Sequence, residues 1–450
     1  MDTRLRENLV VGSKLDLSDL SGAALHRFAA QLFPIYRSLS GPGVRQTLAM
    51  IRERLPDLEV HQIASGVKAF DWRVPDEWTI RDAYVVDPKG ERIIDFKRHN
   101  LHVVGYSEPV DTTLSLDVLQ EHLFSLPDQP EAIPYVTSYY SRSWGFCIRH
   151  IDRLRLQPGD YRVRIDSDLG PGVLNYGEVL IPGESPEEVL LSTYVCHPSM
   201  GNNEVSGPVV TTFLGQWLAS LPRRRFSYRL VFVPETIGSI VYLSRNLEAL
   251  KRNVIAGFVV TCVGDDRGYS YLASRLGDTL ADRVAVSALS ELAPGFTRYS
   301  FLDRGSDERQ YCSPGVDLPV VSVMRSKYGE YPEYHTSLDD LTLITPNGLL
   351  GGFTALKRCI ETIESNRTYK VDCLCEPQLG KRGLYPNLSS KGSADDSRTM
   401  MDLIAYCDGD HDLLAIAEKI GVPFAKLEPI IEILQRAELL SEIPRGFSET

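Results

Sequence analysis

Polar side chains follow several apolar segments of the sequence, at the point where each segment stops. His197 follows "VLLSTYVC", Glu235 follows "RLVFVP", and His335 lies in "YGEYPEYHTSLDD", after "LPVVSVMR". Asp265 and Asp266 follow "GFVVTCVG" in the same way. Because ligands of open α/β sheets bind beyond the carboxyl ends of the strands, we expect these side chains to converge at one edge of a sheet.

Two histidines and several carboxylates at one sheet edge are the groups that a hydrolytic zinc site requires. Neutral imidazole and carboxylate bind zinc, and a further carboxylate accepts the proton of the attacking water. His335 is the stronger candidate ligand, because "EYHTSLDD" offers polar neighbours that orient its ring. Asp307 and Glu308, in "RGSDERQYCSPG", add two carboxylates between two predicted strands.

Each of these residues also has a structural interpretation. His197 could be a hydrogen-bonded histidine at a strand end, and Glu235 could stabilise the first turn of the helix that follows it. The carboxylates of Asp307 and Glu308 could belong to a solvated loop, and we favour a solvated loop for Asp265 and Asp266. No single residue therefore decides the function.

The elements that position these residues follow from periodicity. From residue 175 onward, continuous apolar strands alternate with amphipathic helices, which predicts an α/β domain whose sheet is covered on both faces. Residues 18–54 predict two helices, with Ser or Gly at their starts. Short alternating segments from about 57 to 110 predict a compact all-β insert.

The C-terminal part has a different pattern. Residues 366–394 are polar and rich in turn residues and predict a linker, and the last 50 or so residues predict three helices of a winged helix-turn-helix. The last helix carries Glu428, Glu432 and Glu438 against few basic residues. Because phosphate contacts depend on Lys and Arg, packing or protein interaction is favoured over nucleic acid binding.

Composition sets broader limits. The chain of 450 residues has 43% hydrophobic residues and a net charge of -12, which disfavours a polyanionic partner. The first 20 residues show no targeting pattern, and the apolar runs fall short of the roughly 20 residues of a membrane helix, so we expect a cytoplasmic protein with no membrane partner. The 8 cysteines are scattered and predict reduced thiols. A homo-oligomer is left open.

Four separated strings carry a family resemblance: "CHPSMGNNEVSGPVV", "VFVPETIGS", "GSDERQYCSPGVDLPVVS" and "EYPEYHTSLDDL". Together they resemble a bacterial aminopeptidase-like family related to the zinc aminopeptidases and glutaminyl cyclases. The resemblance implies a mixed sheet with helices on both faces, a small inserted all-β domain and a C-terminal winged helix. The expected domains are N-terminal helices 1–56, insert 57–150, catalytic domain 151–370, linker 371–394 and winged helix 395–450.

The resemblance also implies roles for individual residues. The metal-bridging Asp of zinc peptidases corresponds to Asn203, their general base to Glu235, their second zinc-binding Glu to Thr236, and their late ligand to His335. Asn and Thr are poor replacements for carboxylate ligands, so we expect one zinc ion rather than two. The expected metal ligands are His197, Glu204 and His335, with Asp307 in reserve.

The leading hypothesis is a metal-dependent aminopeptidase-like hydrolase that cleaves an N-terminal residue or a related small amide. Glu235 is the predicted general base, and Glu308 is both a second catalytic candidate and a reserve ligand. Asn203, Tyr328 and Tyr334 are candidates for substrate contact. The alternatives are an amide hydrolase acting on a modified sugar or metabolite, and a catalytically degenerate ligand-binding or interaction protein.

Overall fold

The computed structural model describes residues 20–139, 141–384 and 391–444. Residues 1–19 lie outside these ranges, and so does most of the N-terminal segment whose sequence shows no targeting pattern. The described chain divides into two compact units. One comprises the described residues up to 281 together with 297–354, and the other comprises residues 282–296 and the described residues from 355 onward.

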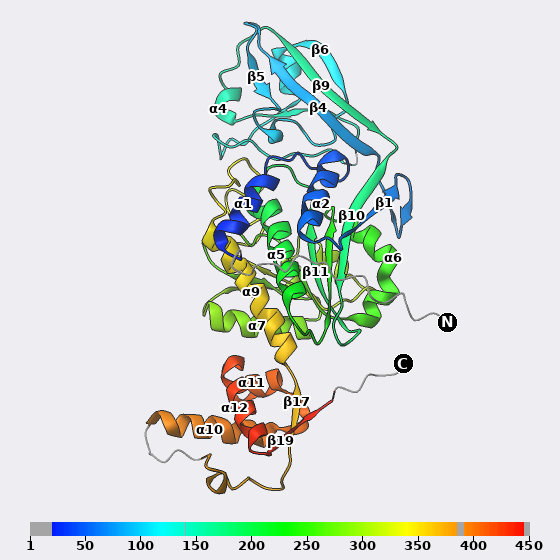
Figure 1. Ribbon diagram of the computed structural model, residues 1–450. Helices are drawn as coiled ribbons and strands as arrows, with labels where there is room; N and C mark the ends of the chain where they lie inside the picture. The colour runs from blue at the N-terminus through cyan, green and yellow to red at the C-terminus, as the bar shows by residue number, and fades with distance from the viewer. Residues whose placement is uncertain (1–19, 140, 385–390, 445–450) are drawn as a thin grey trace, which may run out of the picture. The chain divides into compact units, whose positions relative to one another are not determined.

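A large mixed sheet forms the core of the first unit (Figure 1). Its strand order is β1–β10–β12–β11–β13–β16–β14–β15. The bounds are β1 Glu59–Ala64, β10 Val173–Ile181, β11 Glu188–Tyr194, β12 Ser227–Val233, β13 Val254–Val259, β14 Ser270–Leu272, β15 Thr297–Tyr299 and β16 Val320–Met324. The neighbouring strands β12, β11, β13 and β16 run parallel. Every residue of β11 is buried, as expected for a central strand whose two faces are both covered.

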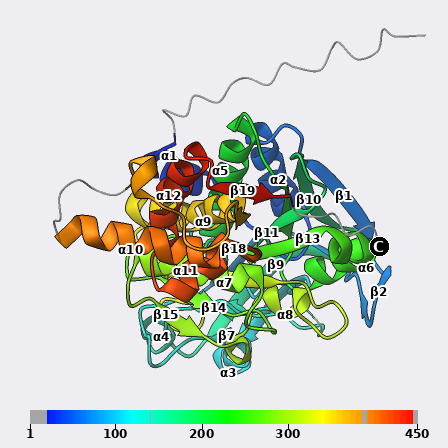
Figure 2. The ribbon, with the colours of Figure 1, turned by 90° about the horizontal axis from the view of Figure 1, so that it is seen from below.

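Helices cover both faces of this sheet. Helices α1 (Gly22–Leu32), α2 (Pro42–Arg54) and α5 (Ser206–Ser220) lie on one face, and α6 (Ile237–Asn253) and α8 (Glu308–Tyr311) lie on the other (Figures 1 and 2). Ser21 caps α1 by accepting a hydrogen bond from the Ala24 N–H, and Gly41 precedes α2. The predicted α/β sheet with helices on both faces is confirmed.

A second, antiparallel sheet has the strand order β5–β4–β9–β6. Its strands are β4 Glu77–Val86, β5 Arg92–Asp95, β6 Val110–Ser115 and β9 Asp160–Gly170. The segment between β6 and β9 contains two short strands, β7 (Leu123–Phe124) and β8 (Phe146–Cys147), which pair with each other. It also contains the short helices α3 (Leu116–Gln120) and α4 (His150–Arg153). Strand β1 falls within the predicted insert 57–150 but pairs with β10 of the large sheet, and β9 of the small sheet lies beyond residue 150. A small antiparallel sheet is therefore present, but its strands do not follow the predicted limits of the insert.

The second unit contains the winged helix. Its helices are α10 (Lys391–Tyr406), α11 (Leu413–Ile420) and α12 (Phe424–Arg436). A small sheet in the order β18–β17–β19 completes it, with β17 Thr368–Val371, β18 Asp408–Asp412 and β19 Leu440–Ile443. Asp412 caps α11 by accepting from the Ala415 N–H. Helices α7 (Leu280–Leu292) and α9 (Pro346–Ser365) cross the boundary between the two units.

The cysteines are free thiols, and those inside apolar segments are buried, as predicted. The "CLC" pair, Cys373 and Cys375, lies in a more exposed loop. None of the helices in the described ranges is both long and apolar enough to cross a membrane.

Candidate functional site

Two neighbouring parallel strands, β11 and β12, end side by side. Tyr194 at the end of β11 is in register with Val233 at the end of β12. His197 lies in the loop after the first strand and Glu235 in the loop after the second. The Sγ atom of Cys196 accepts a hydrogen bond from the Glu235 N–H at 3.1 Å, which ties the two loops together. The sheet edge thus brings His197 and Glu235 into contact.

His197 lies between two carboxylates. Its Nδ1 atom is 3.0 Å from Oε2 of Glu204, and its Nε2 atom is 3.4 Å from Oε2 of Glu235. Burial favours the neutral ring, but the neighbouring Cys196 and Glu204 outweigh burial and raise the pKa of His197 well above its ordinary value. Because Nδ1 of His197 is held by Glu204, Nε2 is the ring nitrogen that is available to bind a metal ion or to exchange a proton.

Glu204 is buried with a cation. It lies in the π-helical turn Gly201–Val205 that leads into α5, and its Oε1 atom accepts from Nε of Arg37 at 3.1 Å. Both side chains are 1% exposed. The same Nε of Arg37 donates to the backbone carbonyl of His197 at 3.0 Å. Both oxygens of Glu204 therefore have partners, and its carboxylate orients the imidazole of His197.

His335 reaches the same place from the loop after β16. Its ring centroid is 5.6 Å from that of His197, and it stacks on Tyr334 with the centroids 3.9 Å apart. Its backbone has φ 56°, a left-handed conformation that is uncommon for a residue with a side chain. Burial, followed by the nearby His197, lowers the pKa of His335 to about 3, so its ring is neutral and available as a ligand.

Tyr135 approaches both histidines from the small β-rich part. Its ring packs edge-on against His197 and His335, with centroid distances of 5.3 and 5.1 Å. Its backbone N–H donates to the carbonyl of His335 at 2.9 Å. Its hydroxyl is 2.6 Å from the hydroxyl of Tyr139. The segment 57–150 therefore contributes an aromatic wall to the site.

Asn203 and Asp339 hold the turn that precedes α5. The side-chain amide of Asn203 donates to the hydroxyl of Tyr194 at 2.7 Å, and Tyr194 packs edge-on against His197. The Oδ1 atom of Asn203 is buried and has no hydrogen-bond partner among the described residues. Asp339 accepts from the backbone N–H groups of Asn202 and Asn203 at 2.6 and 2.9 Å, which joins this turn to the His335 loop.

Asp307 lies beneath the Glu235 loop. Its Oδ1 atom accepts from the Thr236 N–H at 2.7 Å and from the Ser239 hydroxyl at 2.8 Å. Its Oδ2 atom is buried without a partner in the described part of the chain. Burial, reinforced by the charge of Glu235, raises the pKa of Asp307 to about 7. Burial also raises the pKa of Glu235. Both carboxyls therefore titrate closer to neutral pH than exposed carboxyls do.

Thr236 occupies the position where the resemblance places a second metal-binding glutamate. It has φ 63°, and its hydroxyl accepts a hydrogen bond from the guanidinium of Arg309. A permanent cation therefore lies beside the residue that would need to hold a second metal ion. The charge of Arg309 opposes the binding of a metal cation at this position.

Glu308 and Tyr328 bind each other. Glu308 is fully buried, and its Oε1 atom accepts from the N–H groups of Gly305 and Ser306 and from the Tyr328 hydroxyl at 2.6 Å. The Tyr328 hydroxyl in turn accepts from the Gly305 N–H at 2.8 Å. These contacts anchor the start of α8, so we assign neither residue a step in the chemistry. Of the two candidate tyrosines, only Tyr334 packs on a histidine of the site.

Asp265 differs from its sequence interpretation. The prediction of a solvated loop is wrong for Asp265, which is fully buried. Its Oδ2 atom accepts from the side-chain amide of Asn202 and from the Ser326 N–H, both at 2.9 Å. Asp266 is exposed, as predicted. Asp265 joins the loops that carry Asn202 and Ser326.

Side chains of the types that bind zinc gather at this sheet edge. Nε2 of His197, the neutral ring of His335 and the unpartnered Oδ1 of Asn203 are the available ligand types, and Glu235 lies at 3.4 Å from His197 as a proton acceptor. Donor atoms of Cys196, His197 and Glu204 also lie within 4.8 Å of one another. Glu204 is already neutralised there by Arg37, so this second group is better described as a hydrogen-bonded cluster.

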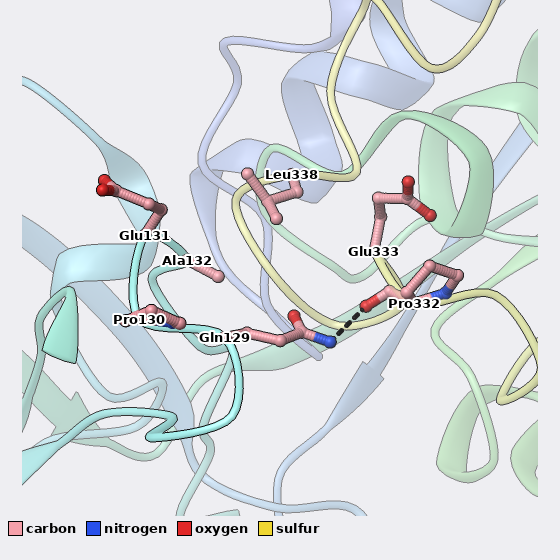
Figure 3. Close-up of a pocket in the computed structure, with 7 residues that line it drawn as sticks. All are labelled: Gln129, Pro130, Glu131, Ala132, Pro332, Glu333 and Leu338. Atoms are coloured by element: carbon pink, nitrogen blue, oxygen red, sulfur yellow. Dashed lines mark hydrogen bonds between the residues drawn. The ribbon is translucent and has the colours of Figure 1, made fainter.

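A separate pocket lies near the His335 loop. Seven residues line it: Gln129, Pro130, Glu131, Ala132, Pro332, Glu333 and Leu338 (Figure 3). Gln129 donates through Nε2 to the carbonyl of Pro332 at 2.8 Å, across the pocket floor. Neither histidine nor Glu235 contributes to the lining, so this pocket is distinct from the cluster of histidines and carboxylates.

Several residues of the site were not found by sequence reasoning. Arg37, Tyr135 and Arg309 lie outside the segments that carry the two histidines, and no local spacing marks them. Asp339 alone carried a signal, since the "HTSLDD" string placed two carboxylates near His335. The other three come into contact only through the tertiary fold.

Known proteins resemble the chain over nearly its whole length. Residues 26–366 match a family described as a domain of unknown function, DUF4910, and residues 367–442 match a winged helix-turn-helix family. A protein of Clostridium acetobutylicum, named a polysaccharide biosynthesis protein with aminopeptidase-like domain, is 45% identical over 427 residues. That alignment covers 94% of this chain and 97% of the relative.

Solved structures of related proteins also resemble the chain over most of its length. The crystal structure of a protein of Clostridium acetobutylicum described as a peptidase has a TM-score of 0.88 and 44% identity, covering 94% of this chain and 96% of that one. A zinc aminopeptidase of Bacillus subtilis has a TM-score of 0.56 at 11% identity, covering 76% of this chain and 95% of its own. At that identity the likeness shows the fold alone, which is aminopeptidase-like.

Proposed function

Because the chain belongs to the DUF4910 family and has an aminopeptidase-like fold, we propose that it is a zinc-dependent hydrolase of an N-terminal residue or a related small amide. The observation that carries this proposal is the position of His197, whose Nδ1 binds Glu204 while its Nε2 faces Glu235 at 3.4 Å. The neutral ring of His335 lies beside it, with the ring centroids 5.6 Å apart.

In this proposal, His197, His335 and Asn203 hold one zinc ion, and Glu204 orients His197. Zinc, when bound, supplies a Lewis acid that polarises water and the substrate carbonyl. The resemblance to zinc peptidases first placed a ligand role on Glu204 and a reserve ligand role on Asp307. The contacts of Glu204 with Arg37 and His197 support an orienting role instead.

Glu235 is the proposed general base and acid. Its Oε2 atom accepts a proton from the attacking water and returns it to the leaving nitrogen. Burial raises the pKa of Glu235, and His197 and Arg309 partly oppose this rise, so the carboxylate is a stronger base than an exposed one. Asp307, beneath it, helps to hold the proton because its own pKa is about 7. Tyr135 and Tyr334 exclude water around the two rings.

Metal content tests the proposal first. Zinc should bind at close to one equivalent per wild-type chain, measured by plasma emission spectrometry on protein purified without an affinity tag. His197→Ala and His335→Ala should each lose it. A matched control is His122→Ala, because His122 stacks on Trp144 and lies apart from the site. Wild-type protein that stays metal-free after incubation with zinc would contradict the hydrolase proposal and favour a ligand-binding protein.

A second substrate type follows from the name of the relative. A protein 45% identical to this chain is named for polysaccharide biosynthesis, and N-acylated amino sugars carry amide bonds of the same chemistry. A panel of aminoacyl amides and N-acetylated amino sugars, assayed with zinc-loaded wild type and Glu235→Gln, separates the two classes. Turnover of either class that depends on Glu235 would identify the substrate type.

A further inference from the structure

Arg309 forms no ion pair with the described residues of the chain. It lies in α8, half-buried, and donates through Nη2 to the hydroxyl of Thr236. Its Nε atom is buried and has no hydrogen-bond partner among the described residues. In the described part of the chain, no carboxylate comes within ion-pair distance of its guanidinium. Among the described residues, the guanidinium therefore donates only to a neutral hydroxyl.

The acids nearest to Arg309 in sequence are engaged elsewhere. Asp307 accepts from the Thr236 N–H and the Ser239 hydroxyl, and Glu308 accepts from the N–H groups at the start of α8 and from Tyr328. The loop therefore has two carboxylates next to Arg309, and both turn away from it. Their contacts leave the guanidinium free to bind another anion.

Arg309 also lies close to the proposed reaction centre. Thr236, which it contacts, follows Glu235 directly in the chain. Burial raises the pKa of Glu235 and that of Tyr334, the residue that stacks on His335, and the positive charge of Arg309 partly opposes both rises. The guanidinium is thus within electrostatic range of both loops that carry the site. An anion bound to it would lie next to the amide that Glu235 acts on.

A partly buried guanidinium without a carboxylate partner is costly, and it is suited to bind a planar oxyanion through two parallel hydrogen bonds. We propose that Arg309 binds a carboxylate of the substrate, so that the preferred substrates are small amides with a carboxylate next to the scissile bond. N-acylamino acids and dipeptides belong to this class. This inference rests on the proposed function for the identity of the reacting bond, but binding itself does not require hydrolysis.

The test compares two probes that differ only in charge. N-acetylglycine carries a carboxylate beside its amide, and N-acetylglycinamide replaces that carboxylate by a neutral amide of similar shape. Titration calorimetry of the wild type should show at least about tenfold tighter binding of N-acetylglycine, as expected for charge-assisted hydrogen bonds. Arg309→Gln should lose this preference, and Arg309→Lys should keep part of it.

Three controls separate anion binding from other roles. Arg304→Gln removes an exposed arginine from the same segment and should keep the preference. Thr236→Val removes the hydrogen bond to Arg309 but leaves the charge of Arg309, and this variant should also keep the preference for N-acetylglycine. Loss of the preference in Thr236→Val would show instead that Arg309 acts by supporting the loop. The zinc content and the melting temperature of Arg309→Gln should stay close to those of the wild type.

The outcomes distinguish this inference from the proposed function. Equal affinity for both probes, no detectable binding of either, or a preference that survives in Arg309→Gln would overturn the carboxylate site. A wild type that binds no zinc but still prefers N-acetylglycine would leave the carboxylate site standing and overturn only the hydrolase proposal.

Discussion

The Nδ1 atom of His197 lies 3.0 Å from Oε2 of Glu204, in a pair from which solvent is almost entirely excluded. On the other side of Glu204, Arg37 supplies the charge that makes a buried carboxylate tolerable. This chain of three residues fixes one imidazole nitrogen and leaves the other for function. Its members come from the loop between α1 and α2, the loop after β11 and the turn before α5.

The stability of the first unit should depend on Glu204. Glu204→Ala leaves Arg37 as an uncompensated buried charge, so we expect a loss of about 3–5 kcal/mol in the free energy of unfolding, measured by urea titration. Glu184→Ala is the matched control, because Glu184 pairs with Arg223 on the surface, and it should cost less than about 1 kcal/mol. Equal losses for both variants would contradict the assigned role of Glu204.

Glu235→Gln should separate chemistry from metal binding. The glutamine keeps the shape of the side chain but cannot accept the proton of water, so turnover of a substrate found by the panel should fall by about 10²- to 10⁴-fold. Zinc content should not change, because Glu235 is not a proposed ligand. Glu330→Gln, an exposed change in the His335 loop, should leave turnover within about twofold. Loss of zinc in Glu235→Gln would instead make Glu235 a ligand.

Asp307 should make stability depend on pH. Its pKa is about 7 in the folded chain against an ordinary 3.8, so the proton is held more tightly in the folded state. The resulting stabilisation is fully present below pH 3.8 and is lost as the pH rises through about 7. Asp307→Asn keeps the acceptor oxygen for Thr236 without the charge. Above pH 7 it should therefore raise the free energy of unfolding by roughly 1–4 kcal/mol.

The same substitution should also affect catalysis. Without the neighbouring charge of Asp307, the acidic limb of the pH–rate profile should move to lower pH, because Glu235 would ionise more easily. Asp266→Asn, an exposed change at the same sheet edge, should move neither the stability nor the pH–rate profile. An unchanged profile in Asp307→Asn would show that the two carboxyls do not share protons.

Tyr135 should control how firmly the histidines are held. Tyr135→Ala removes the ring that packs edge-on against His197 and His335, and we expect zinc affinity to fall by about tenfold, measured by competition with a chelator. Tyr135→Phe keeps the ring and loses only the hydroxyl contact to Tyr139, so its zinc affinity should stay near that of the wild type. Similar losses in both variants would point to the hydroxyl rather than the ring.

Sequence periodicity was enough to predict the large sheet and the positions of His197, Glu235 and His335, because apolar strands and the polar loops after them leave a local pattern. The sequence shows no comparable pattern for side chains that lie in loops and are nevertheless buried. Asp265 occurs in a string that looks solvated, yet two loops fold over it and supply its hydrogen bonds. Position after a strand does not reveal which acids the loops will cover.

Contacts between distant segments were the other limit. Arg37 lies 167 positions from Glu204, and Tyr135 comes from the small β-rich part, so neither could be assigned to the site by spacing. The role of Glu204 also changes once Arg37 is seen, since its carboxylate then has partners on both oxygens. A candidate ligand can be recognised by residue type, but whether its oxygens are free depends on the fold.

The carboxylate of Asp339 joins the turn of Asn202 and Asn203 to the loop of His335, because each of its oxygens accepts a hydrogen bond from a backbone N–H of that turn. The two histidine loops are therefore coupled mechanically, and one cannot swing open without releasing the other. Substrate entry and product release must either leave both loops closed or open them in a single concerted motion. Amide exchange at Asn202 and Asn203 would follow that motion, since those two protons become accessible only when the coupling breaks.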